Sequence, residues 1–284
     1  MKLIHLFLCI FALSFCVLAY IAIVSFGRND DNKTHNNKLD WTLQQFRSIN
    51  KSHHCRIEFL DEINEFINGE NPPQLNLPQL TWIASTVQTS AHTAWESKHR
   101  RHNFLVWGLG HDSAIWDNVN CVEVSSSPLI SIGRTQFLEN WKEWIGSVKE
   151  KLPHLEVQFF DQYQHTFGSP DKFFKSPSLL KLPSTIQNAC WDVVLVDAPQ
   201  GYEDNHPGRM ESTYWSVDMA ERCIVSGKLD TVHVFLHDVN RPLEKRIMNE
   251  LLLKKGGAYL GIISGNLGDL VGFRFTNKSF YKKS

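Results

Sequence analysis

Asn103-Phe104-Leu105-Val106-Trp107-Gly108-Leu109-Gly110-His111-Asp112-Ser113 is the stretch that decides the fold of this chain. Its apolar run stops at two glycines, and a short polar segment then leads into a helical pattern. Glycine lets the backbone turn tightly and approach a ligand closely, and the start of the next helix offers free N–H groups. The pattern is typical of the first strand, turn and helix of a nucleotide-binding α/β sheet, although the third glycine of the dinucleotide fingerprint is missing.

Strand and helix patterns alternate after this turn, and helices are predicted before it, around residues 55–68 and over residues 80–97. Short apolar runs predict strands at residues 135–138, 157–160, 191–196 and 231–236, and helical spacing predicts helices at 141–148, 212–223 and 243–253. Residues 259–263 and 270–275 predict a closing antiparallel pair, whereas residues 173–188 resemble a loop because of Pro177 and Pro183. Alternation of this kind predicts a mostly parallel, doubly wound sheet.

Length and composition bound the class of protein. The chain has 284 residues, of which 42% are hydrophobic, enough for one large α/β domain plus a tail. Its formal net charge is -1, so no electrostatic nucleic-acid binding is expected.

The N-terminal region predicts a membrane anchor. No charged residue lies between Leu3 and Phe26, a run long enough to cross a bilayer. The run is long for the apolar core of a cleaved signal peptide, so we favour an uncleaved signal anchor, with a cleaved signal as the alternative. Basic residues on both sides leave the orientation to the rest of the chain.

Glycosylation sequons and cysteines suit a lumenal body. Sequons begin at Asn32, Asn50 and Asn277. Four cysteines outside the apolar run allow three pairings, and no spacing among them resembles a zinc site. Buried free thiols and two disulfides both remain open for Cys55, Cys121, Cys190 and Cys223.

Polar side chains follow three of the predicted strands. They are the group from Gly108 to Ser113, then Asp197, and then the group from His237 to Arg241. Ligands of such sheets bind beyond the carboxyl ends of the strands, near the point where the strand order reverses. An acidic residue that holds a ribose is also expected there, for which Glu139 is the candidate and Glu123 the alternative.

Five ordered motifs resemble those of the plant glucuronoxylan 4-O-methyltransferases and their relatives, in the xylan/polysaccharide-biosynthesis methyltransferase domain. They extend over roughly residues 80–275, and in this chain Asn140 replaces a second acidic residue of the family and extra residues occur near 122–132. The motifs are Gly108-Leu109-Gly110-His111-Asp112-Ser113 with Trp116, Phe137-Leu138-Glu139 with Trp144, Val196-Asp197-Ala198-Pro199-x-Gly201-Tyr202, Pro207-Gly208-Arg209-Met210, and Val234-Phe235-Leu236-His237-Asp238-Val239-Asn240-Arg241.

The resemblance implies an S-adenosylmethionine-dependent O-methyltransferase with a Rossmann-like, class I methyltransferase fold, anchored in the Golgi membrane as a single-pass type II protein. The acceptor would be a glycan, such as uronic-acid-containing xylan. The implied domains are a cytoplasmic end and anchor (1–28), a stem (29–40), an N-terminal helical cap (41–98) and the methyltransferase domain (99–284). The implied cofactor contacts are Gly108, Gly110, His111, Asp112, Ser113 and Glu139.

Methyl transfer to a sugar hydroxyl requires a base or a metal ion, because the hydroxyl is a poor nucleophile at neutral pH. We expect Asp197, His237 and Asp238 to be the catalytic residues, since they follow neighbouring strands. In one version Asp197, Asp238 and Asn240 hold a divalent ion, and in the other His237 or Asp238 is a direct general base. A third possibility is that Asp238 and Asn240 only cap the following helix.

Three further residues are candidates for substrate binding. Arg209 could pair with a uronic acid carboxylate, and Tyr202 could stack on a sugar ring. Arg241 lies in the motif after the fifth strand. An ordinary surface arginine and a core tyrosine are the alternatives for Arg209 and Tyr202. The basic cluster at residues 98–102 is read either as a solvated rim or as a contact for an acidic sugar.

Overall fold

A computed structural model describes residues 73–123, 130–177 and 181–280. The chain divides into two compact units, Met1–Ser52 and His53–Ser284, and the described residues all belong to the second. None of the helices in these described segments is long and apolar enough to cross a membrane. The predicted anchor between Leu3 and Phe26, the predicted stem, the predicted helix around residues 55–68 and the first two sequons lie outside the described residues.

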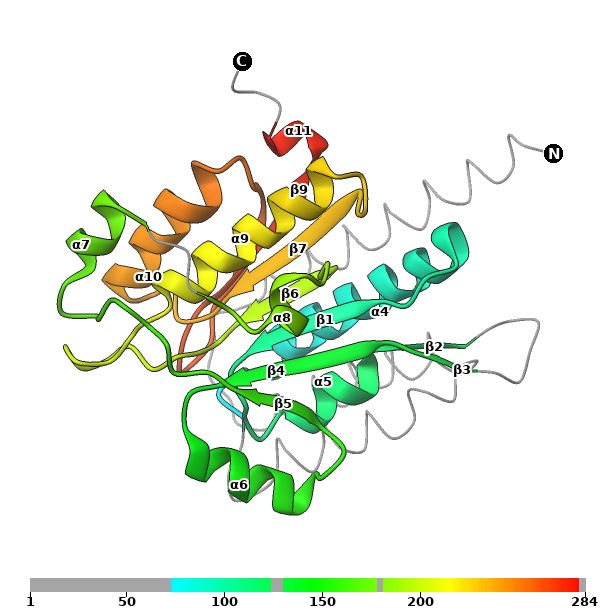
Figure 1. Ribbon diagram of the computed structural model, residues 1–284, viewed down its shortest axis with the longest axis horizontal. Coiled ribbons are helices and arrows are strands. Elements are labelled where there is room, and N and C mark those ends of the chain that lie inside the picture. The colour runs from blue at the N-terminus through cyan, green and yellow to red at the C-terminus, as the bar shows by residue number, and fades with distance from the viewer. Residues whose placement is uncertain (1–72, 124–129, 178–180, 281–284) are drawn as a thin grey trace, which may run out of the picture. The chain divides into compact units, whose positions relative to one another are not determined.

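The main sheet has seven strands in the order β5-β4-β1-β6-β7-β9-β8 (Figure 1). Five strands are parallel, from β5 to β7, and β9 pairs antiparallel with β7 and with β8. The predicted α/β class and the closing antiparallel pair are therefore confirmed. The strands are β1 (Asn103–Trp107), β4 (Arg134–Glu139), β5 (Glu156–Phe159), β6 (Val193–Val196), β7 (Thr231–Leu236), β8 (Ala258–Ile263) and β9 (Leu270–Thr276).

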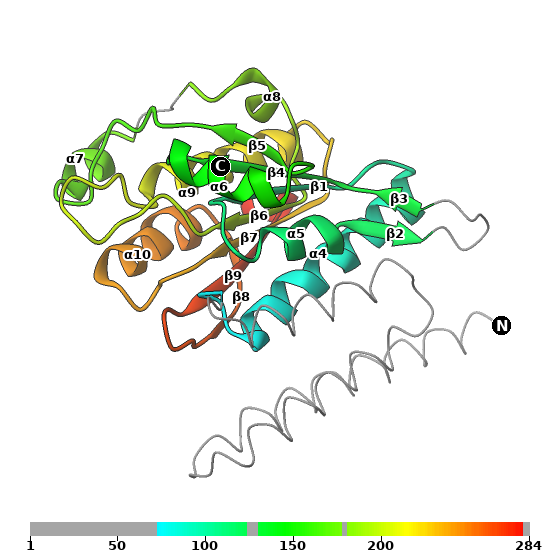
Figure 2. The ribbon, with the colours of Figure 1, turned by 90° about the horizontal axis from the view of Figure 1, so that it is seen from below.

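Helices cover both faces of this sheet because its central strands are apolar on both sides. On one face Trp107 Nε1 donates to Ser216 Oγ of α9 (Met210–Val225) at 3.0 Å. On the other face Phe104 packs edge-on against Trp116 of α5 (Ser113–Val119). Figure 2 shows the sheet between these helix layers.

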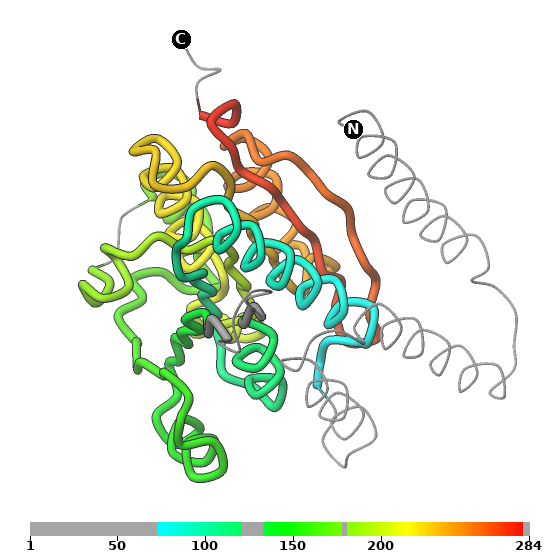
Figure 3. Tube along the Cα trace, turned by 90° about the vertical axis from the view of Figure 1, so that its right-hand side faces the viewer, coloured from blue at the N-terminus to red at the C-terminus, as the bar shows by residue number. Residues whose placement is uncertain are grey.

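The first described helix, α4 (Leu77–Lys98), lies on the same face as α5. Trp82 meets Phe235 of β7 edge-on, with the ring centroids 5.1 Å apart. At its first turn Gln79 Nε2 donates to the carbonyl of Ile263 at 3.0 Å, and Figure 3 shows this end of α4 beside the end of β8. Although we predicted residues 41–98 as a separate cap, α4 packs directly on the sheet.

The structure adds to or corrects the secondary structure predicted from the sequence in three places. Residues 173–188 are not all loop, because α7 (Pro170–Lys175) and α8 (Ser184–Gln187) each begin beside a proline, which is well tolerated at a helix start. Among the extra residues near 122–132, the described ones belong to a separate antiparallel pair of β2 (Cys121–Glu123) and β3 (Ile130–Ile132). The last long helix is divided into α10 (Pro242–Ile247) and a π-helical turn, η2 (Met248–Leu253).

The remaining elements and one covalent link complete the unit. Helix α6 (Lys142–Lys151) contacts β5, and the short α11 (Asn277–Phe280) follows β9. A disulfide joins Cys190, before β6, to Cys223 of α9. This pairing, which the sequence left open, ties a central strand to the helix that covers it.

Candidate active site

The carboxyl ends of the central strands are brought together by the backbone. After β1 the chain continues to β4 and β5 on one side, and it returns to β6 and β7 on the other, so the order reverses between β1 and β6. The N–H of Asp197 donates to the carbonyl of Trp107 at 3.0 Å, and the N–H of His237 donates to that of Val196 at 3.1 Å. The three predicted groups therefore lie side by side at the expected edge of the sheet.

The glycine turn after β1 leaves little space for a side chain at Gly108 or Gly110. Gly108 has φ of +117°, and a Cβ there would lie 3.1 Å from the Cβ of Ala198. A Cβ at Gly110 would lie 2.6 Å from Oδ1 of Asp112. The turn is closed by a bond from the N–H of Gly110 to Oγ of Ser113 at 2.9 Å. The backbone can thus approach a ligand closely at this position.

Asp112 brings a second carboxyl group toward Asp197. It stands at the start of α5, yet its side chain makes no capping hydrogen bond within the described chain. Burial, followed by repulsion from Asp197, raises the pKa of Asp112 to about 7. A positively charged group bound between these two carboxyls would relieve the repulsion.

Glu139 joins the end of β4 to the glycine turn. Its Oε2 accepts from the N–H of Leu109 at 3.0 Å, and its Oε1 accepts from the N–H groups of Asn140 and Trp141 at 2.7 and 2.9 Å. Burial raises the pKa of Glu139, although these N–H groups oppose the shift. The side chain is at the predicted ribose position, and its backbone contacts hold it there.

Aromatic rings border the turn. The Trp144 indole N–H donates to the carbonyl of Leu109, and the Trp144 ring meets that of exposed His111 edge-on. Trp141 stacks on Trp144 and is 51% exposed. His111 is therefore placed on the rim, outside the most buried part of the site.

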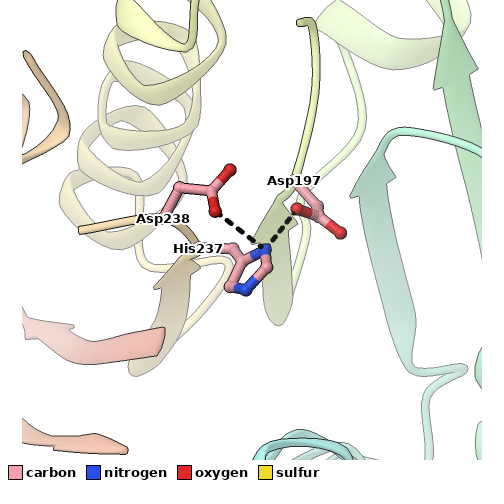
Figure 4. Close-up of side chains that lie close together, drawn as sticks. All are labelled: Asp197, His237 and Asp238. Atoms are coloured by element: carbon pink, nitrogen blue, oxygen red, sulfur yellow. Dashed lines mark hydrogen bonds and ion pairs between the residues drawn. The ribbon is translucent and has the colours of Figure 1, made fainter. Parts of the chain in front are cut away.

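Asp197, His237 and Asp238 form the centre of the site (Figure 4). His237 Nδ1 lies 2.8 Å from Oδ1 of Asp197 and 3.9 Å from Oδ1 of Asp238. His237 and Asp238 are buried, whereas the Asp197 side chain keeps 21% exposure. In Figure 4 the second carboxylate oxygen of Asp197 points away from His237. Asp197 is thus the most accessible of the three groups.

The charges of this pair stabilise each other. Burial alone would raise the pKa of Asp197, but His237 and then Arg209 more than offset this effect and lower it. Burial alone would lower the pKa of His237, but Asp197 reverses the shift and raises it. The pair therefore shifts Asp197 toward its carboxylate form and His237 toward its protonated form.

Arg209 has a different place from the one we predicted. It is only 5% exposed, and its Nη2 donates to the carbonyl and to Oδ1 of Asp197 at 2.7 and 3.0 Å. Its Nη1 donates to the carbonyl of His237 at 2.9 Å and to Oδ2 of Asp238. The guanidinium joins the ends of β6 and β7, which leaves it poorly placed to meet a substrate carboxylate.

The polar residues in the segment after β7 lie in different environments. Asp238 has φ of +65°, in the left-handed region, and its Oδ2 also lies 3.0 Å from Nη1 of Arg241. Asn240 is exposed, in contrast to buried Asp238. The interpretation of Asp238 and Asn240 as helix caps is wrong, because the residue before α10 is Arg241 and the Asp238 carboxylate binds two arginines.

A divalent ion fits the donor chemistry of this centre in part. Ligand atoms from Asp197, His237 and Asp238 all lie within 4.8 Å of one another. His237, which we had not expected as a metal ligand, is the third member of this cluster. Arg209 already bonds to both carboxylates, so an ion would have to share them with a guanidinium.

The remaining candidates lie apart from the centre. Tyr202 is 64% exposed and meets His206 edge-on, so it is no core residue. Arg241 keeps 33% side-chain exposure beside Asp238. In the basic cluster, Arg100 bonds to Asp192 through both terminal nitrogens and His102 is buried, so those two residues serve the fold. Sequence reasoning did not single out Glu244, which is fully buried in the first turn of α10.

Several known proteins are similar in sequence to this chain. The family model described as IRX15/IRX15L/GXM matches residues 172–259. Arabinogalactan O-methyltransferase 1 of Arabidopsis thaliana is 34% identical over 216 residues, which cover 69% of this chain and 67% of the relative. Glucuronoxylan 4-O-methyltransferase 1 of the same plant is 35% identical, over 53% of this chain and 55% of the relative. The chain spans about half the length of most of these curated relatives.

Among solved structures, a methyltransferase from Pseudomonas syringae that is described only by its general class matches 69% of this chain and 99% of its own. The identity is 11% and the TM-score 0.34. A score at this level adds nothing to the fold assignment, which rests on the strand order.

Proposed function

This chain belongs to the IRX15/IRX15L/GXM family, and on that premise we propose that it is an S-adenosylmethionine-dependent O-methyltransferase that acts on a glycan hydroxyl. The observation that carries the proposal is the meeting of the glycine turn, Asp197 and His237 at the point where the strand order reverses. Fold alone would not carry it, because the same sheet supports many activities.

The residues at the edge of the sheet fit the cofactor. Gly108 and Gly110 leave the backbone accessible, and Asp112 and Asp197 present two carboxyls to the same space. When bound, S-adenosylmethionine supplies an electrophilic methyl group on a positively charged sulfur. Glu139, Gly108, Gly110 and Ser113 would hold its ribose and amino-acid parts, with His111 at the rim.

We assign proton removal from the acceptor to Asp197. His237 and Asp238 are too deeply buried to touch a glycan, whereas one oxygen of Asp197 is open. His237 and Arg209 hold the other oxygen, so the carboxylate is fixed before the acceptor arrives. Proton transfer to a positioned carboxylate typically contributes about 10²–10⁴-fold to a rate.

The alternative for the same step, activation of the acceptor hydroxyl, is assistance by a divalent metal ion. Asp197, His237 and Asp238 would hold a divalent ion, which would lower the pKa of the acceptor hydroxyl. We propose the Asp197 mechanism, because Arg209 and Arg241 already balance the charge of Asp238. A chelator distinguishes the two, since only the metal mechanism loses turnover and recovers it with added cation.

The acceptor is proposed from the relatives. Two are named for glucuronoxylan and arabinogalactan, so an acidic plant-type polysaccharide is our first candidate, including the 4-hydroxyl of a glucuronic acid side chain. Tyr202, which is exposed, and Arg241, which keeps 33% side-chain exposure beside Asp238, would meet the sugar. Other relatives, such as Protein IRX15-LIKE at 27% identity, have names that state no activity, which keeps a non-catalytic role in polysaccharide biosynthesis as the second candidate.

The proposed location is the Golgi membrane, with the catalytic unit in the lumen. The apolar run between Leu3 and Phe26 supports an anchor, and the Cys190–Cys223 disulfide suits an oxidising compartment.

The test is to incubate the purified chain with methyl-labelled S-adenosylmethionine and a panel of xylans, arabinogalactans and neutral glycans, with and without a chelator. We expect label to enter an acidic polysaccharide in both conditions. Cofactor binding without transfer to any glycan would favour another acceptor, and failure to bind the cofactor would remove the enzyme proposal.

A further inference from the structure

Two short helices near the catalytic centre carry basic side chains that the proposed mechanism does not use. They are α7, which follows β5, and α10, which follows β7, and Figures 1 and 2 show them side by side. Lys172, Lys175 and Lys245 are exposed, and the side chain of Arg246 keeps 40% exposure. Asp171 is the one exposed acidic residue of these two helices. An excess of one sign of charge favours partners of the opposite sign.

One arginine joins the two helices. Arg246 of α10 pairs with Asp171 of α7 at 2.6 Å, and its guanidinium carbon lies 4.2 Å from the centre of the Phe174 ring. Lys175 is four residues after Asp171 in the same helix, so the two side chains are neighbours on its surface. The basic residues of α7 and α10 therefore belong to one continuous face.

This face leads into the catalytic centre. Arg241, the residue before α10, has its Nη1 3.0 Å from Oδ2 of Asp238 and keeps 33% side-chain exposure. The N–H of Lys245 donates to the carbonyl of Arg241 at 3.0 Å, and residues spaced in this way share one side of a helix. A row of basic side chains thus extends from Asp238 along α10 to α7. We call this row the basic strip, which consists of Arg241, Lys245, Arg246, Lys172 and Lys175.

Three charges of the basic strip are left for a partner. Arg241 pairs with Asp238 and Arg246 with Asp171, whereas no carboxylate of the described segments forms an ion pair with any of the three lysines. Exposed Asp204, on the loop after β6, accepts through its carbonyl from the N–H of Gly168 at 2.9 Å, just before α7 begins. A negatively charged chain would therefore be directed along α10 toward the end of α7, away from Asp204.

Helix α6 shows the ordinary pattern of a solvated helix surface by contrast. Its three lysines are interspersed with Glu143 and Glu150, so charges of both signs alternate along it. Lys142 also lies over the ring of Phe159, and Lys149 donates to the carbonyl of Leu155 at 3.2 Å. The basic strip differs in having a single sign of charge and free ammonium groups, within the part of the chain that the structure describes.

We propose that the basic strip is a docking surface for an acidic polysaccharide, where it binds carboxylates of sugar units that flank the methylated one. This inference rests on the proposed function and deepens it, since it makes a charged polymer the preferred acceptor rather than a single sugar. Arg241 meets the unit nearest the reacting hydroxyl, and the lysines meet more distant units. Ammonium groups on flexible stems suit carboxylates at variable spacing, and several weak contacts along one chain add up to firm binding.

A triple variant of the full chain, Lys172→Glu with Lys175→Glu and Lys245→Glu, tests the strip. Its binding to glucuronoxylan and to an acidic arabinogalactan is measured directly, without a methyl donor. The Kd of the polysaccharide that the wild type binds should rise about 30-fold, because three exposed ion pairs are lost. S-adenosylhomocysteine should bind within about twofold of the wild type, which shows that the variant is folded. A wild-type chain that binds neither polysaccharide would overturn the proposal.

Lys151→Glu with Lys228→Glu and Lys278→Glu is the matched control. It makes the same change of charge at exposed lysines near the other end of the strands, because Lys151 precedes β5, Lys228 precedes β7 and Lys278 follows the antiparallel β9. The polysaccharide Kd should change by no more than about twofold. An equal loss of binding in both triple variants would show that only the net charge matters, and would overturn the docking surface.

Other ligands test the chemistry of the partner. The polysaccharide with its uronic acid carboxyls reduced to alcohols should bind the wild type about as weakly as the intact polymer binds the strip variant. Added salt should weaken binding to the wild type and have little effect on the variant. Tighter binding of anionic phospholipid vesicles, lost in the strip variant, would assign the strip to a membrane surface and overturn the proposal.

The binding readout separates this inference from the proposed function. A chain that binds the polysaccharide through the strip but transfers no methyl group to it would support the docking surface and contradict the proposed function. A chain that methylates the polysaccharide with the same KM in the wild type and in the strip variant would support the proposed function and overturn the docking surface.

Discussion

The two ends of the central strands both carry an arginine–aspartate pair with a buried aspartate, but the two carboxylates are satisfied differently. At the amino end, Asp192 receives both terminal nitrogens of half-buried Arg100 and the N–H of Asn103 at 2.9 Å. At the carboxyl end, Asp238 leaves Oδ1 unpaired among the described residues, and its backbone is left-handed. A buried carboxylate oxygen without a partner is uncommon where a charge only stabilises the fold, and such exceptions are typical of functional sites.

The difference indicates that an arginine–aspartate pair can serve either the stability of the fold or the function of the site. Both pairs link segments far apart in the chain, so both resist separation of the strand ends. Unpaired buried atoms occur at both ends of the described strands, with Arg100 Nε, His102 Nε2 and His233 Nδ1 at the amino end and His237 Nε2, Arg209 Nε and Asp238 Oδ1 at the carboxyl end. Only the second group lies beside the glycine turn and Asp197. Substitutions at the amino end should therefore change stability alone, whereas those at the carboxyl end should change turnover.

The largest expected effect is on catalysis. Asp197→Asn should lower methyl transfer about 10³-fold, because the amide cannot accept the acceptor proton, while affinity for S-adenosylhomocysteine, whose sulfur carries no charge, is retained. Turnover with labelled donor and calorimetric binding of S-adenosylhomocysteine measure the two effects. Asparagine is preferable to alanine here, since Arg209 keeps a hydrogen-bond acceptor. Unchanged turnover would remove Asp197 from the mechanism.

Asp192→Ala should have the complementary effect. It leaves Arg100 without its partner, so the free energy of unfolding should fall by about 3–4 kcal/mol. Turnover per folded molecule should stay unchanged, because Asp192 lies at the opposite end of the strands. Urea titration and active-site-normalised kinetics give the two values. A loss of turnover in folded protein would show that the two ends are not independent.

The disulfide gives a second test of the amino end of the strands, because Cys190 is close to Asp192 in the chain. Replacing Cys190 and Cys223 by serine should lower the free energy of unfolding by about 3 kcal/mol, since a loop of this length is freed in the unfolded chain. Cofactor affinity at 25 °C should be retained. A double variant as stable as the wild type would mean that the bond does not constrain the chain.

The pH dependence should have opposite signs at the two ends. Burial, then Arg274, lowers the pKa of His233 to about 4, so its stabilising contribution, present above its unfolded value of 6.5, is lost as the pH falls. The pKa of Asp112 is raised to about 7, so its contribution is present below its unfolded value of 3.8 and is lost as the pH rises through 7.

Variants separate the two contributions. Relative to the wild type, His233→Gln should make the protein gain about 2 kcal/mol more stability between pH 7 and pH 5, and Asp112→Asn should make it gain about 2 kcal/mol less. Urea unfolding at the two pH values measures this change. The same sign for both variants would refute the assignment.

Much of the fold was predictable because buried strands are local patterns. The runs that form β1 and β6 are apolar at every central position, the run that forms β7 is apolar there except at His233, and Gly108 is needed by the turn itself. Asp197 and His237 were predictable as neighbours, because parallel strands bring their carboxyl ends together. Helices α7 and α8 were missed in part because their prolines, which also occur in loops, stand at helix starts.

The burial of Arg209 and Glu244 could not be read from the sequence. Arg209 follows a glycine in a turn, where an exposed arginine is the usual expectation, and its burial depends on contacts with residues from two different strand ends. Glu244 looks like an ordinary acidic residue in a first helical turn. Its burial arises from the close approach of Gly201 and Gly208, which only the folded loop creates.

The most direct measurement is a crystal structure of the chain with S-adenosylhomocysteine. The account predicts the sulfur over the Gly108–Gly110 turn and facing Asp197, with the ribose at Glu139. The product bound at another edge of the sheet, or with Asp197 remote from the sulfur, would contradict it.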